Sequence, residues 1–297
     1  MRIFDKNFFS SGKKISARVM IPENEYEHKS VPAIVINHGY SGDKNEYDSM
    51  AEFLCNEGYA TLQFDSRGCG NSEAVKGRMM CSTEWIEDAY NAVSYILSYD
   101  CVDQNKIGFT GCSMGGALTI VMSALDKRVK CAVAMAPVAS GKNMLELNWK
   151  KFRGSEAYEH FLSELKADSL AVSLGKPSKI VSVPHALGMN ISDEKEYLQI
   201  RAMNKELVST VPLESVVNSF FLFEPDLYSA DIDVPFMIIH GDMDEIVSIE
   251  QSKNLVKKIK SETKLVVIKE GLHPLPLSDK AHEVFEHIVG WFNRYLL

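Results

Sequence analysis

Residues 108–116 read GFTGCSMGG, and this stretch decides how the chain is expected to fold. The apolar run that ends at Gly111 predicts a strand, and the apolar residues after Ser113 predict a helix that starts at once. Ser113 therefore has to occupy a tight corner with its hydroxyl above the sheet edge. Side chains two positions before and after it would clash there, which explains Gly111 and Gly115. The G-x-S-x-G pattern in this setting predicts a nucleophile elbow with Ser113 as the nucleophile.

Two other interpretations of this stretch are weighed against the elbow. A glycine-rich turn between a strand and a helix also uses a serine as a helix cap. Cys112 is a second nucleophilic side chain, but it stands one position before the centre of the pattern. The following helix directs its free N–H groups and the positive end of its dipole at the corner, which favours the elbow.

Strands and helices alternate on both sides of the elbow. A continuous apolar run such as 31–39 is typical of a strand that is buried on both faces. The order predicts parallel β-α-β units with right-handed crossovers. Strands are predicted at 16–22, 31–39, 61–68, 106–111, 129–137, 233–241 and 263–271, and helices at 47–60, 82–99, 113–125, 249–261 and 279–297.

The alternation stops in the middle of the chain. Apolar residues at helical spacing in 155–170 and 211–223 predict two helices, and a stretch with glycine and proline between them leaves room for a short strand. We therefore expect a mainly helical insertion between two strands of the sheet. The predicted parts are a first core segment at 1–137, an inserted cap at 138–230 and a second core segment at 231–297.

A serine hydroxyl needs a base to act as a nucleophile near neutral pH. In this architecture the acid and then the histidine follow the serine, on loops at the carboxyl ends of later strands. His273 lies between the last predicted strand and the last predicted helix, so we predict that it is the base. The other histidines after Ser113 fall in the insertion, at a strand end or on the last helix: His160, His185, His240, His282 and His287.

The acid is expected in the loop HGDMDEIV, which follows the strand ending at His240. Asp242, Asp244 and Glu245 compete for the role. Asp244 is favoured because it lies deeper in the loop and precedes the apolar pair that can anchor the loop. Asp242 is then a turn-forming or supporting residue. A metal site made of His240, Asp242 and Asp244 is the alternative, and the turn context disfavours it.

An anionic tetrahedral intermediate needs two N–H donors that already point at it. The backbone N–H of Met114, directly after the nucleophile, is the first candidate. The second should come from the loop after the strand at 31–39, and Tyr40 is predicted to supply it. The alternative for this HGYSG loop is an ordinary flexible connection between a strand and a helix.

Together these motifs resemble the α/β-hydrolase fold over nearly the whole chain. The stretches NHGYSGDKNEY, FDSRGCGNS, WIEDAYNAVSYI, GCSMGG, IIHGDMDEIV and GLHPL are similar to those of cinnamoyl and feruloyl esterases, and of related serine aminopeptidase-like hydrolases. The resemblance implies hydrolysis of carboxylic esters by Ser113, His273 and Asp244, on small-to-medium esters with an apolar or aromatic acyl group. Tyr40 differs from the phenylalanine that is often found there, which changes the wall of the pocket.

Composition sets limits on partners and location. A formal net charge of −8 argues against nucleic acid or an anionic membrane as a partner. The six cysteines include no C-x-x-C pair, so neither disulfides nor a zinc site are expected. We expect a cytoplasmic protein that takes a small-molecule ester and needs no metal or organic cofactor. A homodimer is left open.

The same catalytic residues serve other reactions. A serine aminopeptidase would need a carboxylate in the cap for the substrate ammonium, and a coenzyme A thioesterase would favour a basic entry patch, against which the acidic charge argues. A hydrolase-like binding protein without turnover is the rival from another class. A complete set of serine, aspartate and histidine counts against it, because a receptor would not need all three.

Overall fold

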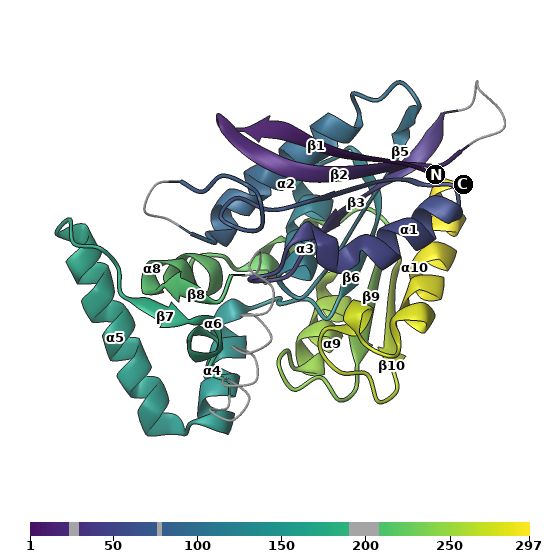
Figure 1. The fold of residues 1–297 in the computed structure, drawn as a ribbon. Coiled ribbons are helices and arrows are strands. Elements are labelled where there is room, and N and C mark those ends of the chain that lie inside the picture. Colours follow the sequence, from purple (N-terminus) through teal and green to yellow (C-terminus); the bar gives the residue numbers. More distant parts are fainter. Residues whose placement is uncertain (24–29, 76–78, 190–207) are drawn as a thin grey trace.

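The computed structural model describes residues 1–23, 30–75, 79–189 and 208–297 of the chain. Within them, one twisted sheet of eight strands forms the centre of the molecule (Figure 1). The strands run in the order β1 (Arg2–Ser10), β2 (Lys13–Ile21), β4 (Ala60–Phe64), β3 (Val31–Asn37), β5 (Val102–Cys112), β6 (Val129–Met135), β9 (Phe236–Gly241) and β10 (Thr263–Ile268).

The sheet is parallel from β4 to β10, as the alternation of strands and helices predicts. Two antiparallel pairings extend it at one edge, where β1 pairs with β2 and β2 pairs with β4. The sequence analysis missed β1. Its residues are mostly exposed, so the strand lacks the apolar run by which the buried strands are found.

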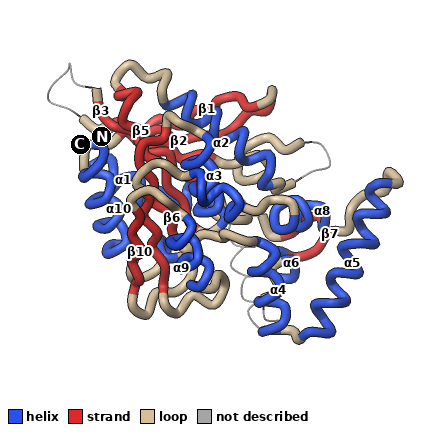
Figure 2. Tube along the Cα trace, turned by 180° about the vertical axis from the view of Figure 1, so that it is seen from behind, coloured by secondary structure: helices blue, strands red, loops and turns tan. Residues whose placement is uncertain are grey.

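Helices cover both faces of the sheet (Figure 2). Successive residues of β3 show the two faces, because Val35 packs in one apolar cluster and Ile34 and Ile36 in another. The two faces therefore have separate cores. α2 (Ser82–Ile96), α3 (Met114–Leu125) and α9 (Ile249–Lys258) lie on the face of Val35, and α1 (Asp48–Asn56) and α10 (Ala281–Leu296) lie on the other.

Between β6 and β9 the chain leaves the sheet. The described part of this segment consists of α4 (Gly141–Phe152), α5 (Ser155–Ser173), β7 (Ile180–Ser182), α6 (Val183–Ala186), β8 (Thr210–Pro212), α8 (Leu213–Val216) and the turns η2 (Val217–Phe221) and η3 (Pro225–Asp231). Where one helix is predicted at 211–223, the structure instead has β8, which pairs with β7, a single turn of α-helix and a π-helical turn. The predicted helix is interrupted because Pro212 favours an extended start.

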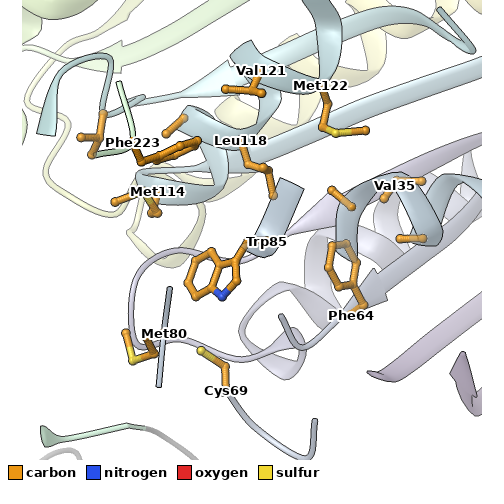
Figure 3. Packing of buried hydrophobic residues seen from close by; sticks show 14 of the residues in the cluster. Val35, Phe64, Cys69, Met80, Trp85, Met114, Leu118, Val121, Met122 and Phe223 are labelled. Carbon is orange, nitrogen blue, oxygen red and sulfur yellow. The ribbon is translucent and has the colours of Figure 1, made fainter. Parts of the chain in front are cut away.

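The segment between β6 and β9 shares a core with the sheet. Trp149, Phe161 and Phe220 belong to the same apolar cluster as residues of β3, α2 and α3. Figure 3 shows Phe223 among Met114 and Leu118 of α3. The described helices include none that is long and apolar enough to cross a membrane.

Candidate active site

Ser113 stands at the junction of β5 and α3 in a strained backbone conformation. Its φ is +59° and its ψ is −116°, a region that residues with a side chain rarely adopt. The two glycines of the motif are required by contact. A Cβ added to Gly115 would lie 2.3 Å from the carbonyl oxygen of Asn37, and one added to Gly111 would lie 2.6 Å from the Gly115 carbonyl. The structure thus gives the predicted elbow geometry.

The loop after β3 passes directly beside Ser113. A Cβ added to Gly39 would lie 3.5 Å from the Cβ of Ser113. Met114 is the first residue of α3, where backbone N–H groups have no partner within the helix. Tyr40 and Met114 both line the cavity that Ser113 lines. The structure therefore brings the two predicted oxyanion residues together beside Ser113, and the role of their N–H groups stays a prediction.

The side chain of Tyr40 is anchored to the segment between β6 and β9. Its hydroxyl forms a 2.8 Å hydrogen bond with Ser215 Oγ, which itself donates to the carbonyl of Met80 at 2.8 Å. Its ring makes an edge contact with Phe220 at 4.9 Å between centroids. Burial raises the pKa of Tyr40, so the phenol is neutral at physiological pH. Tyr40 links the loop after β3 to the segment between β6 and β9.

His38 also holds the loop after β3 in place, through hydrogen bonds of its ring. The backbone N–H of Ser66 donates to His38 Nε2 at 3.0 Å, so the proton is on Nδ1, which donates to the Gly39 carbonyl at 2.7 Å. Burial lowers the pKa of His38 and keeps the ring neutral. The sequence analysis missed this residue because it considered only histidines after the serine. The sequence signal that could have identified His38 is a histidine directly before a glycine at the end of a strand.

A hydrogen bond joins His273 to Asp244 at the edge of the sheet. Nδ1 of His273 lies 2.8 Å from Asp244 Oδ2, and Asp244 Oδ1 accepts bonds from the N–H groups of Ile246 at 2.9 Å and Val247 at 2.8 Å. Burial alone would raise the pKa of Asp244, but the adjacent His273, His240 and Val247 N–H outweigh it and hold the pKa well below its usual value. The carboxylate is therefore ionised and able to orient His273.

The two competing acids are not joined to His273. Asp242 is exposed, and its carboxylate accepts the N–H of Glu270 at 2.6 Å. Glu245 is also exposed and pairs with Lys151 at 3.1 Å. Within the described residues, no group of three histidine, cysteine, aspartate or glutamate side chains could hold a metal ion. The geometry therefore favours Asp244 among the three acids.

His240 contacts the acid, a contact that the sequence analysis did not predict. Its ring is fully buried, and its Nε2 lies 2.9 Å from the Val247 carbonyl and 3.4 Å from Asp244 Oδ2. Nε2 therefore carries the proton, and Nδ1 accepts from the Ser252 hydroxyl at 2.6 Å. His240 thus holds the turn after β9 and also contacts the carboxylate that pairs with His273.

Ser113 and His273 both line a cavity of about 330 Å³. Ser113, His273 and the loop at 39–41 line one side of it. Most of its wall is apolar, with a carboxylate at Glu46. Within the described residues no hydrogen bond joins the Ser113 hydroxyl to His273, a bond that is often long in the absence of substrate. The opposite side is lined by the segment between β6 and β9, through Met144, Leu187, Met189 and Phe220.

The family described as "Serine aminopeptidase, S33" matches residues 28–280. The chain belongs to this family of α/β hydrolases. The predicted fold class and the predicted membership of the α/β-hydrolase superfamily are thereby confirmed.

Relatives of this hydrolase are known from sequence and structure. An uncharacterized 31.7 kDa protein from the traX-finO intergenic region of Escherichia coli is 29% identical over 268 residues, 89% of this chain and 88% of that protein. The structure of DcsB in complex with its substrate analogue aligns with a TM-score of 0.83 at 18% identity, over 99% of both chains. Est1E from Butyrivibrio proteoclasticus with bound ferulic acid aligns with a TM-score of 0.69 at 20% identity, over 98% of both chains. The two structures share the fold.

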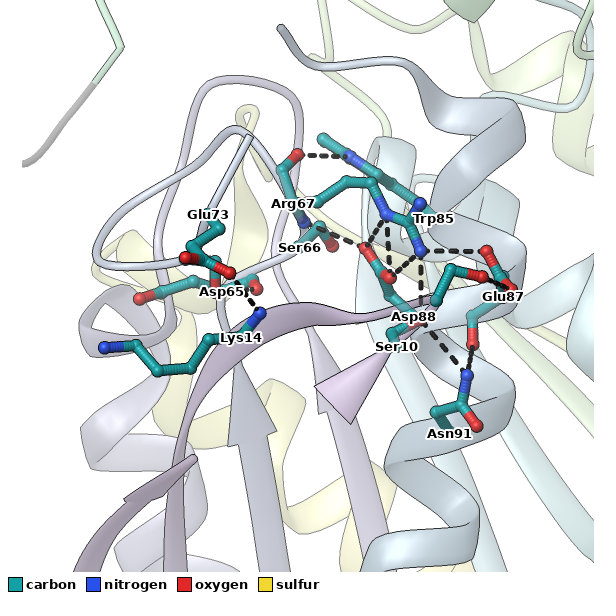
Figure 4. A network of polar contacts seen from close by, with 12 residues as sticks. Ser10, Lys14, Asp65, Ser66, Arg67, Glu73, Trp85, Glu87, Asp88 and Asn91 are labelled. Atoms are coloured by element: carbon teal, nitrogen blue, oxygen red, sulfur yellow. Dashed lines mark hydrogen bonds and ion pairs between the residues drawn. The ribbon is translucent and has the colours of Figure 1, made fainter. Parts of the chain in front are cut away.

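The FDSRG stretch of the hydrolase, residues 64–68, makes buried polar contacts that hold the elements around the site in place. Asp65 is fully buried and accepts from the backbone N–H of Lys44 at 2.7 Å and from its ammonium at 2.9 Å. This pair fixes the start of η1 (Lys44–Tyr47), which lines the cavity. Arg67 donates to Asp88, Ser10 and Glu87, and accepts at its carbonyl from Trp85 (Figure 4). Asp65 and Arg67 are both buried, and these contacts hold the FDSRG stretch in place.

Proposed function

We propose that this hydrolase cleaves carboxylic esters through an acyl-enzyme on Ser113. The observation that carries the proposal is the meeting of three features at one cavity. Ser113 stands on a strained strand-to-helix corner, His273 faces the same cavity with Nδ1 on Asp244 at 2.8 Å, and the wall is mostly apolar. This is the arrangement that a serine nucleophile with a histidine base requires.

The first half of the reaction forms the acyl-enzyme. Nε2 of His273 takes the proton of the Ser113 hydroxyl as Oγ attacks the ester carbonyl carbon. The carbonyl oxygen becomes an anion, which the N–H groups of Tyr40 and Met114 stabilise. The bond from carbon to the alkoxy oxygen then breaks, and His273 gives its proton to the leaving alcohol.

The second half releases the acid. A water molecule gives a proton to His273 Nε2 and attacks the acyl carbon, and the same two N–H groups stabilise the second intermediate. Ser113 leaves with the proton from His273. Asp244 remains ionised throughout and stabilises the imidazolium that forms in each half, and this role needs the low pKa that its surroundings provide.

The proposed substrates are small-to-medium esters with an apolar or aromatic acyl group. A cavity of about 330 Å³ lies at the lower end of the range for ligand pockets, which favours compact groups over long lipid chains. Ferulic acid, the ligand of the structural neighbour Est1E, is an acyl group of this kind. The described part of the insertion contributes apolar side chains to the wall, whereas an aminopeptidase would need a carboxylate there for the substrate ammonium.

A cytoplasmic location and a small-molecule partner complete the proposal. All six cysteines are free thiols, which fits a reducing compartment. The acidic net charge of −8 disfavours nucleic acid and anionic membrane surfaces. The homodimer stays a prediction.

One experiment tests the class of reaction. The intact protein is treated with a fluorophosphonate probe and then assayed with p-nitrophenyl esters, aminoacyl anilides and an acyl thioester. We expect labelling at Ser113 and turnover of the esters at a kcat/KM at least about tenfold above that of the anilides. Faster turnover of the anilides would establish the peptidase alternative, and faster turnover of the thioester would establish the thioesterase. Labelling without any turnover would identify a binding protein.

A further inference from the structure

A second cavity lies directly behind the active-site cavity. It measures about 290 Å³, close to the 330 Å³ of the first. It is bounded by one face of α4 and by the loop that carries Asp244. Met144 and Ile246 line both cavities. These two side chains therefore form the wall between them.

The two halves of this wall differ in how firmly they are held. The N–H of Ile246 donates to Asp244 Oδ1 at 2.9 Å, and its carbonyl accepts from Asn148 Nδ2 at 3.1 Å. Its backbone is therefore fixed by the acid itself. Met144 on α4 is 2% exposed, and its unbranched thioether is held by apolar packing. The Met144 side chain can therefore be shortened without removing a hydrogen bond to Asp244.

The lining of the second cavity is part apolar and part polar. Beyond Met144 and Ile246 its apolar side chains are Leu147 and Ile249, and its polar residues are Asn148, Lys151, Asp244, Glu245 and Ser248. Lys151 and Glu245 form an ion pair whose members are both more than half exposed, which places charge at the outer rim. A chain that passed Met144 would therefore have Leu147 and Ile249 to pack against on its way to the rim.

We propose that Met144 determines specificity by ending the acyl pocket at this wall. The proposal rests on the proposed function, because it concerns the ester that Ser113 attacks. The proposal places the acyl group on the Met144 side, and a series of alkyl acetates, in which only the alcohol varies, tests that placement. The intact wall confines the acyl group to the first cavity. Shortening Met144 joins the two cavities into one pocket of nearly twice the volume.

The test is the acyl-chain profile of Met144→Ala. kcat/KM is measured for p-nitrophenyl esters from acetyl to dodecanoyl, with the wild type alongside. We expect the ratio of decanoyl to butanoyl hydrolysis to rise at least about tenfold, because each accommodated methylene is worth roughly that factor. Met144→Val, which keeps more of the buried volume, is measured as well in case the alanine variant does not fold.

The matched control is Leu147→Ala. Leu147 is on the same helix, is 45% exposed and lines the second cavity but not the first. With the wall intact, its profile should equal that of the wild type. An unchanged ratio in a folded Met144 variant, or an equal shift in Leu147→Ala, would overturn the proposal. So would a shift confined to a series of alkyl acetates, in which only the alcohol varies.

Failure of the proposed function gives a different result. In that case the wild type hydrolyses no ester in the series and the Met144 proposal is rejected with it. A wild type that hydrolyses short esters, with folded Met144 variants of identical profile, rejects the role of Met144 alone. Circular dichroism and thermal unfolding of each variant establish that it is folded.

Discussion

The two sides of the active-site cavity are held by different kinds of force. On the strand-end side, Ser113, His273 and the loop at 39–41 are fixed by glycine contacts and by buried hydrogen bonds through His38, Asp244 and their partners. On the insertion side, Met144, Leu187 and Phe220 are fixed mainly by apolar packing. Directional bonds hold atoms where a reaction needs them, whereas packing sets a volume. Substitutions on the first side should abolish turnover, and those on the second should change which ester is preferred.

Ser113→Ala should have the largest effect. Removal of the nucleophile should lower kcat for p-nitrophenyl esters by about 10⁴-fold or more and abolish fluorophosphonate labelling, because no other hydroxyl is held in the elbow. The variant should unfold at nearly the wild-type temperature. Labelling that persists in the folded variant would mean that another residue is the nucleophile.

Asp244→Asn should have the next largest effect. We expect a loss of roughly 10³- to 10⁴-fold in kcat, because His273 loses the carboxylate that orients it and stabilises its charged form. Asp242→Asn is the matched control in the same loop, and its carboxylate contacts the N–H of Glu270 instead. Its kcat should stay within about tenfold of the wild type. The reverse order of the two losses would move the catalytic acid to Asp242.

Phe220→Ala should change substrate preference while Ser113 stays reactive. Phe220 is buried in the insertion and packs on Tyr40, so its loss should lower kcat/KM for aromatic esters by about tenfold while Ser113 still reacts with a small fluorophosphonate. Leu222→Ala, two residues away and 67% exposed, should match the wild type. If Phe220→Ala also abolishes labelling, the insertion holds the nucleophile side in place as well.

The smallest expected effect is a pH dependence of stability on the strand-end side. Burial lowers the pKa of His38, so the folded protein keeps it neutral while the unfolded chain takes up a proton below about pH 6.5. The free energy of unfolding should therefore fall as pH decreases below 6.5, with His38 contributing at most about 1.4 kcal/mol per pH unit. Urea titrations of the wild type and His38→Asn between pH 7 and 5 measure this. Equal slopes would show that the pKa of His38 is the same in the folded and unfolded chains.

The parts of the site that could be predicted from the sequence are those fixed by local chain geometry. The elbow was readable because a strand, a corner and a helix meet within nine residues, and the corner requires Gly111 and Gly115. The order of elements predicted the two loops that carry His273 and the acid, since the carboxyl ends of parallel strands meet at one edge. The choice of Asp244 over Asp242 and Glu245 rested on its place in the loop, and the structure places Asp244 against His273. The exposed strand β1 and the broken helix at 211–223 were missed, because apolar periodicity says little about exposed or interrupted elements.

The sequence by itself determined the sheet of alternating units, the corner that exposes Ser113 and the loops that carry His273 and Asp244. Only the tertiary structure decided that His38 fixes the loop of Tyr40, that His240 lies 3.4 Å from Asp244, and that Met144 and Ile246 separate two cavities. The physical reason is the range of the interactions. Strand, corner and helix signals act between residues close in the chain, whereas these contacts depend on how distant elements pack, which no local pattern records.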